Sequence, residues 1–347
     1  MNQFIINLPI SFYKIHESLI KKDWLVSPFK VDKKDLYDPA KYIYSEDFYG
    51  YQYKLILDRN IFSFIISASL KSKHKQIYRD AIALIVFCQI ANIMIEPNLA
   101  VYEKINYETS NANEAIKELI QFYKTDNCEN KILMNYATGL SNSIILSTKN
   151  RWDARKIKAQ MTKHQWLKEW KSLYLIVLNL IYISEKENSN KEKLKIFIEW
   201  MVKEFRLSLV SIVYAIFLFS SMRQKNMIKY RRRDSVIQRQ RQIYNMTWDL
   251  FFMNNFFRKW VGKKEKEEFL IATDDKVLKN ILEKAILIQM NEDFKAINNY
   301  LHPNEKPIIE TIRNTINSTH DRIYLSDEWS YEYQEKLIKE KVNMLLN

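Results

Sequence analysis

The chain has 347 residues, of which 47% are hydrophobic and 14% aromatic, so it can bury a sizeable core and does not have the composition of a disordered protein. Its formal net charge of +13 favours an anionic partner, with nucleic acid first and a membrane surface second. Only three glycines occur, which excludes a glycine-rich phosphate loop and therefore a P-loop NTPase or a Rossmann dehydrogenase.

The cysteines and the N-terminus indicate a cytoplasmic protein. Cys88 and Cys128 are too few for a disulfide framework and lack metal-ligand spacing. No basic stretch leads into the hydrophobic core of a signal peptide. The five histidines are scattered without a zinc-binding pair, and no Gly-x-Ser-x-Gly turn supports a serine hydrolase.

The first half of the chain predicts alternating strands and helices. Three prolines interrupt residues 1–50, which are expected to form an irregular arm. Residues 54–57 then predict a short buried strand that ends at Asp58, and residues 61–70 and 77–91 predict two apolar helices. This strand–helix order favours a parallel sheet with flanking helices.

The second strand and the helix after it carry the next candidate acid. Residues 92–95 predict a short strand that Pro97 stops. Asn98 is expected to cap the following helix, on which Glu103 lies.

From about residue 110 to residue 242 the spacing of apolar residues predicts mostly helix. Residues 207–221 are the most hydrophobic stretch, but they fall short of the roughly 20 apolar residues that span a membrane. We therefore expect a buried helix and no membrane partner. A last strand is predicted at residues 269–273, followed by a helix to about residue 300 and a helical tail.

Acidic residues lie next to apolar segments at four places in this order of elements. Asp58 and the Asp274/Asp275 pair follow predicted strands, and Glu103 and Asp249 lie at predicted helices. Carboxylates are rarely buried without a partner, and the carboxyl ends of parallel strands meet at one edge of a sheet. The pattern therefore predicts a site for a hard metal ion, with Mg²⁺ or Mn²⁺ favoured.

Four short motifs resemble the PIN-domain nucleases, in the order in which that family carries them. They are LDRN at residues 57–60, IEPNLAVYE at residues 95–103, WDL at residues 248–250 and TDDK at residues 273–276. The third acid of the family opens a helix, and Asp249 is expected to do the same. The recognisable segments cover about residues 51–104 and 243–283.

The resemblance implies a three-layer α/β/α fold with a parallel sheet and a metal-dependent endonuclease, most often one that cleaves RNA. It assigns both catalysis and metal binding to Asp58, Glu103, Asp249 and Asp275. Asp274 would cap a helix or bind a second ion. Asp249 follows Glu103 by 146 positions, which requires a large helical insertion, placed at about 108–242 within a domain at 51–283. Residues 284–347 would be a helical C-terminal extension.

Basic residues near these acids are candidates for holding the phosphate backbone of a nucleic acid. They are Arg59, Lys229, Arg231, Arg232, Arg233, Arg239, Arg241 and Lys276. The alternatives are a solvated helix face or ion pairs within the chain, with Asp234 as one acceptor and a local salt bridge for Arg59. By family analogy the enzyme is a toxin or phage-defence effector with an inhibitory or triggering protein partner, and self-association is compatible with that setting. The rival interpretation is a non-catalytic nucleic-acid-binding or scaffold protein.

Overall fold

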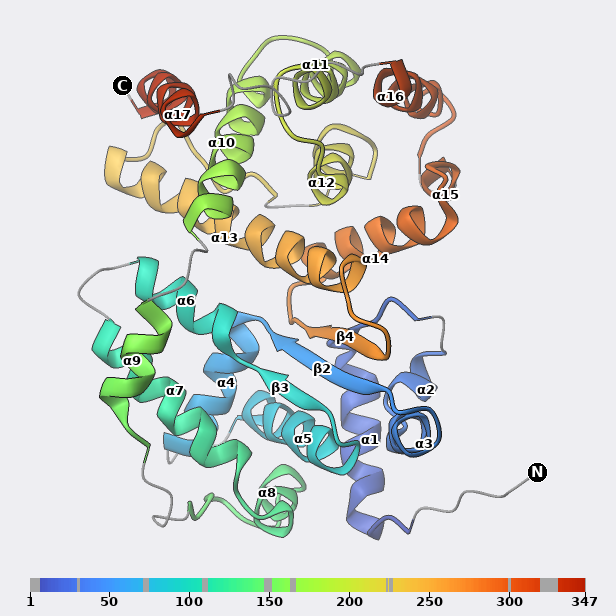
Figure 1. Cartoon of the computed structure of the whole chain (residues 1–347), viewed down its shortest axis with the longest axis vertical. Helices are drawn as coiled ribbons and strands as arrows, with labels where there is room; N and C mark the ends of the chain where they lie inside the picture. Colours follow the sequence, from blue (N-terminus) through green and yellow to red (C-terminus); the bar gives the residue numbers. More distant parts are fainter. Residues whose placement is uncertain are drawn as a thin grey trace. The chain divides into compact units, whose positions relative to one another are not determined.

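The computed structural model describes residues 7–29, 32–70, 75–107, 112–146, 152–162, 167–222, 224, 227–298, 301–318 and 330–346. Contacts between residues divide the chain into two compact units. One consists of Met1–His164 with Arg258–Asp275, and the other of Gln165–Phe257 with Lys276–Asn347. Figure 1 shows the helices and strands of both units.

The first unit contains a mainly parallel sheet with the strand order β1-β4-β2-β3. β2 runs parallel to both of its neighbours, and β1 is antiparallel to β4. The strands are β1 (Leu25–Val26), β2 (Gln52–Leu57), β3 (Met94–Glu96) and β4 (Glu267–Ala272). The prediction of an α/β protein with a parallel sheet is confirmed to this extent.

Burial explains why β2 and β4 pair at the centre of the sheet. Leu55, Ile56 and Leu57 are at most 1% exposed, and they lie opposite the equally buried run 270–272 of β4. Consecutive buried residues mean that both faces of the strand are covered, as is usual for parallel sheets. Because the two strands are parallel and in register, the residues that follow them emerge at the same edge.

Helices surround this sheet. They are α1 (Ile10–Lys22), α2 (Lys33–Leu36), α3 (Pro39–Tyr49), α4 (Arg59–Leu70), α5 (Gln76–Ile90), α6 (Asn98–Tyr107), α7 (Ala112–Asp126), α8 (Asn130–Ala137) and α9 (Ala154–Thr162). α5 is the most enclosed of them, because α1, α3, α4 and α8 all pack against it. α6 packs on β2, α4 and α7.

The expectation of an irregular N-terminal arm is wrong for the described residues before residue 50. They form α1, β1, α2 and α3, and β1 is a strand of the sheet. α1 buries Phe12, Ile15 and Leu19, whose spacing places them on one face of a helix. Pro9 precedes α1 and Pro39 opens α3, where a proline does not interrupt the helical hydrogen bonds, and Pro28 lies in the bend after β1.

The segment that the sequence assigned to one insertion, at about 108–242, is divided between the two units. α7, α8 and α9 belong to the sheet unit, where α7 contacts α4, α6 and α9. The second unit is helical throughout its described residues. Its helices are α10 (Leu167–Ser184), α11 (Asn190–Lys203), α12 (Leu209–Phe219), most of α13 (Val236–Val261), α14 (Lys276–Asn291), α15 (Lys295–Asn298), α16 (Pro307–Ser318) and α17 (Tyr331–Leu346).

The most hydrophobic segment of the chain is a core helix, as expected. Every residue of α12 from Val210 to Phe219 is 5% exposed or less. Within the described ranges, no helix has the length and apolar character that a membrane crossing requires.

The prediction that Asp249 opens a helix is wrong. α13 runs from Val236 to Val261, so Asp249 lies near its middle. No proline or glycine interrupts this stretch, and buried residues such as Ile243, Met246 and Leu250 continue at helical spacing through it.

Candidate functional site at the carboxyl ends of the strands

Thr273 joins the two strand ends that carry candidate acids. Its hydroxyl donates to Oδ2 of Asp58 at 2.9 Å and accepts the backbone N–H of Asp275 at 3.0 Å. The backbone N–H of Asp58 donates to the carbonyl of Ala272 at 3.0 Å, which continues the pairing of β2 with β4. Since Thr273 is only 2% exposed, its two side-chain hydrogen bonds set the orientation of Asp58 and of the start of the loop before α14.

The two adjacent acids after β4 have different surroundings. Asp274 is exposed, and its Oδ1 accepts a hydrogen bond from the indole N–H of buried Trp24 at 2.7 Å. Asp275 is half-buried. Asp274 therefore anchors the loop to the segment between α1 and β1. Asp275 is linked to Asp58 through the Thr273 hydroxyl, which accepts the backbone N–H of Asp275 and donates to the Asp58 carboxylate.

Glu103 lies half-buried on α6, the helix that packs on β2 and α4. The helix that carries Glu103 is present as expected. It begins at Asn98 itself, so the position before the helix, where Asn98 was expected as the cap, is held by Pro97. The packing of α6 is the structural basis for grouping Glu103 with Asp58, because α4 begins at the residue after Asp58.

Glu118 of α7 forms ion pairs with two basic side chains in this region. Its Oε2 accepts from Arg59 at 3.0 Å and its Oε1 from Lys104 at 2.7 Å. These two cations are the residues that directly follow Asp58 and Glu103 in the chain. One carboxylate therefore ties the first turn of α4 to α6. Sequence reasoning did not identify Glu118, and its only local signal is Glu114 one helical turn before it, which also pairs with Lys104 at 3.1 Å.

Arg59 forms a salt bridge within the chain, but its partner is Glu118 on α7 and not a neighbour in sequence, so the alternative of a local salt bridge is met only in kind. The guanidinium also lies 5.4 Å from the centre of the Phe62 ring. Its Nη1 is buried and has no hydrogen-bond partner within the described residues. Arg59 is thus directed at α7 and at its own helix.

Glu96, the acid at the end of β3, pairs with a lysine. Lys259 donates to its carboxylate, and both side chains are partly exposed. This ion pair links β3 to the last turns of α13, which belong to the sheet unit.

Asp249 and the basic run before it lie in the helical unit. Lys229 forms an ion pair with Asp249. Arg239 donates to the carbonyls of Leu345 and Leu346 at 2.6 and 2.8 Å, so it caps the last turn of α17. The other members of the run are exposed, namely Arg231, Arg232, Arg233 and Arg241, as is Lys276 at the start of α14.

The contacts on this edge of the sheet link Asp58 and Asp275 through Thr273, while Glu103 lies on the neighbouring helix α6. Across the part of the chain that the structure describes, no group of three or more His, Cys, Asp and Glu side chains is arranged to hold a metal ion. A Mg²⁺ ion is often bound through only one or two carboxylates with water completing its shell. Asp58 and Asp275 supply two carboxylates, which is the number that such a Mg²⁺ ion needs from the protein.

Comparisons with known proteins add no relative to this picture. No family model, no curated protein and no solved structure matches the chain.

Proposed function

We propose that the protein is a metal-dependent nuclease whose site is the edge of the sheet at Asp58 and Asp275. One observation carries the proposal: two adjacent parallel strands each end in an acid, and buried Thr273 hydrogen-bonds to both segments. An open parallel sheet binds its ligands in the crevice beyond the carboxyl ends of the strands. The resemblance of the four motifs to PIN-domain nucleases supports the same residues and a three-layer fold.

Asp58 and Asp275 would hold Mg²⁺ or Mn²⁺, with Glu103 of α6 as a further candidate ligand in the same unit. Asp249 belongs to the other unit and is paired with Lys229, so it is not part of the proposed site. Such an ion supplies an activated water and stabilises the leaving oxygen in phosphodiester hydrolysis. The chain's own contribution is orientation. Thr273 orients the Asp58 carboxylate, and Glu118 ties the start of α4, directly after Asp58, to α6, which carries Glu103.

Charge supports a nucleic acid as substrate. The chain carries a net charge of +13, and the side chains of Arg231, Arg232 and Arg233 are exposed. Contacts from arginine to phosphate position a strand without reading its sequence, so they suit a nuclease of broad specificity. RNA is favoured over DNA by the resemblance, and a cytoplasmic effector restrained by a protein partner remains the proposed setting.

A second candidate function is nucleic-acid binding without catalysis. The exposed arginines favour it, because they serve a binding protein as well as an enzyme. The two functions differ in one property, since binding alone requires neither Mg²⁺ nor the carboxylates at the strand ends.

The test is a cleavage assay on single-stranded RNA and DNA with Mg²⁺, Mn²⁺ or EDTA. Asp58→Asn should lower the rate of cleavage at least about a hundredfold while the protein stays folded, as expected when a catalytic carboxylate is lost. The matched control is Asp47→Asn, an exposed acid on α3, which should cleave at the wild-type rate. Cleavage by Asp58→Asn at the wild-type rate would contradict the site. Binding of RNA without cleavage, unchanged by EDTA, would favour the second function.

A further inference from the structure

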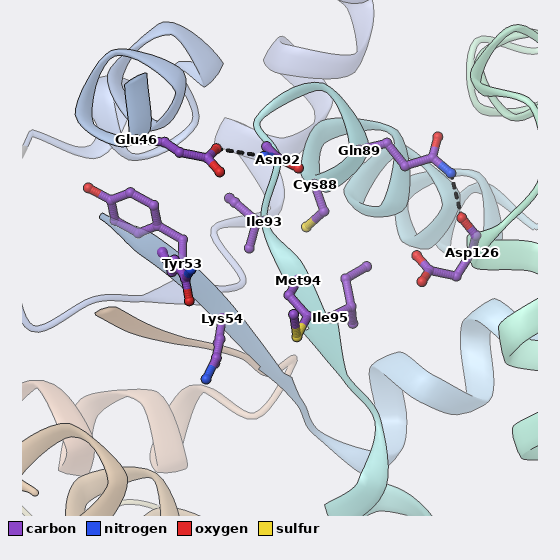
Figure 2. Close-up of a pocket in the computed structure, with 11 residues that line it drawn as sticks. Glu46, Tyr53, Lys54, Cys88, Gln89, Asn92, Ile93, Met94, Ile95 and Asp126 are labelled. Atoms are coloured by element: carbon purple, nitrogen blue, oxygen red, sulfur yellow. Dashed lines mark hydrogen bonds between the residues drawn. The ribbon is translucent and has the colours of Figure 1, made fainter. Parts of the chain in front are cut away.

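A pocket of about 340 Å³ opens on the sheet unit beside the beginning of β3 (Figure 2). Residues from β2, α5, the β3 region, α3 and α7 line it. They are Glu46, Gln52, Tyr53, Lys54, Cys88, Gln89, Asn92, Ile93, Met94, Ile95 and Asp126. Gln52 and Met94 begin their strands, so the pocket lies toward the amino ends of the parallel strands, away from the edge where Asp58 follows β2. Its size is within the range of small-molecule sites.

Asp126 places an uncompensated negative charge in this pocket. Among the described residues, no cation and no hydrogen-bond donor pairs with its carboxylate, and burial raises its pKa to about 6. The amide of Gln89 donates to the backbone carbonyl of Asp126 at 2.6 Å and so fixes the end of α7. Figure 2 shows this hydrogen bond, with the Asp126 carboxylate turned toward the pocket. Asp126 is partly buried, and a carboxylate held away from water without a partner is costly; such groups are typical of binding sites.

The rest of the lining suits a positive charge on a short apolar chain. Glu46 lies on the opposite side of the pocket from Asp126 and accepts from the amide of Asn92 at 2.6 Å. The side chains of Ile93 and Ile95 lie between these two acids in the view of Figure 2, and the ring of Tyr53 lies below Glu46. Aromatic rings attract cations, and aliphatic side chains pack against methylene groups.

The lysine of the pocket does not neutralise these acids. The ammonium group of Lys54 pairs with Glu267 of the neighbouring strand β4 at 3.0 Å, and it points away from Asp126 in Figure 2. Two acids and no uncommitted cation therefore line the pocket.

We propose that this pocket is a binding site for a small organic cation, an amine or guanidinium compound with a short aliphatic chain, and that Asp126 is its charge partner. The proposal does not depend on nuclease activity, because the residues concerned lie outside the site at the carboxyl ends of the strands.

Calorimetric titration of the full chain at about pH 7.5, where the Asp126 carboxylate is ionised, tests the proposal. The probes are putrescine and agmatine, with 1,4-butanediol as the uncharged counterpart of putrescine. Both cations should bind and the diol should not. Asp126→Asn should weaken the binding of both cations at least about tenfold, the effect of losing one charge-assisted hydrogen bond. Asp47→Asn, an exposed acid near Glu46 but outside the lining, should leave the affinity unchanged.

Three results would overturn the proposal. The first is equal binding of the diol and putrescine. The second is wild-type affinity of Asp126→Asn for the cations. The third is no binding of either cation to the wild-type protein up to about 10 mM, a concentration that reveals even millimolar affinity. None of these results bears on cleavage of nucleic acid, so the two proposals fail separately.

Discussion

Replacing Asp126 by asparagine should stabilise the sheet unit at neutral pH. Burial raises the pKa of Asp126 from 3.8 to about 6, and the neighbouring Cys88 and Tyr123 supply no positive charge. At a pH below 3.8 the group is protonated in the folded and unfolded chain alike, and it costs nothing. As the pH rises toward 6 only the unfolded chain releases its proton, so stability is lost through this window and stays lost above it.

The magnitude follows from the shift in pKa. One pKa unit is worth about 1.36 kcal/mol, so the difference between 3.8 and about 6 is on the order of 3 kcal/mol at neutral pH. The asparagine amide must also be desolvated, which reduces the expected gain in the free energy of unfolding to about 2 kcal/mol. Urea unfolding at about pH 7.5 and about pH 4 measures this gain, which should be present at the higher pH and nearly absent at the lower one.

The comparison uses Asp47→Asn as its control, and that variant should unfold like the wild type at both pH values. A variant Asp126→Asn that is no more stable than the wild type at neutral pH would refute the reasoning. An equal gain at both pH values would also refute it, since the effect would then have a cause other than ionisation.

Other predictions concern three polar contacts. Arg239→Met should lower the free energy of unfolding by about 2 kcal/mol and speed proteolysis of the C-terminus, because the last turn of α17 loses its charged donor. Lys22→Met should cost about 2 kcal/mol in urea unfolding, because its partner Asp80 is 1% exposed and would keep a charge without a cation. Thr273→Val should cost about 1–2 kcal/mol in urea unfolding and also slow cleavage, because Asp58 loses the hydroxyl that orients it.

Each of these variants has a matched control. Arg232→Met and Lys21→Met remove exposed cations of the same kind and should change stability by less than about 0.5 kcal/mol. Thr273→Ser keeps the hydroxyl and should cleave nearly as fast as the wild type. Equal losses in a variant and its control would show that the named contact is not the cause.

The sequence was sufficient to predict the central strands, because their signal is local. A short apolar run that ends in an acid predicted β2 with Asp58 and β4 with the Asp274/Asp275 pair, and both strands are where they were expected. Parallel pairing followed from the intervening helices. Thr273, which hydrogen-bonds to both strand ends, could not be foreseen, since its role depends on the register of β2 against β4.

Long-range contacts were beyond reach from one sequence. The ion pairs of Glu118 with Arg59 and Lys104 join three helices. The spacing of apolar residues predicts each helix, but it does not predict which side chains pair between helices. The same holds for Asp126, which ends an ordinary amphipathic helix in sequence and becomes unusual only through the elements that bury it. The position of Asp249 was misjudged for a local reason, because its helix begins thirteen residues earlier, at Val236.

Binding of Mn²⁺ to the full chain, followed by electron paramagnetic resonance, tests the central claim most directly. Wild-type protein should bind Mn²⁺, Asp47→Asn should bind it equally, and the double variant Asp58→Asn/Asp275→Asn should lose the tightest site. Undiminished Mn²⁺ binding by the double variant would contradict the assignment of the strand ends as the metal site.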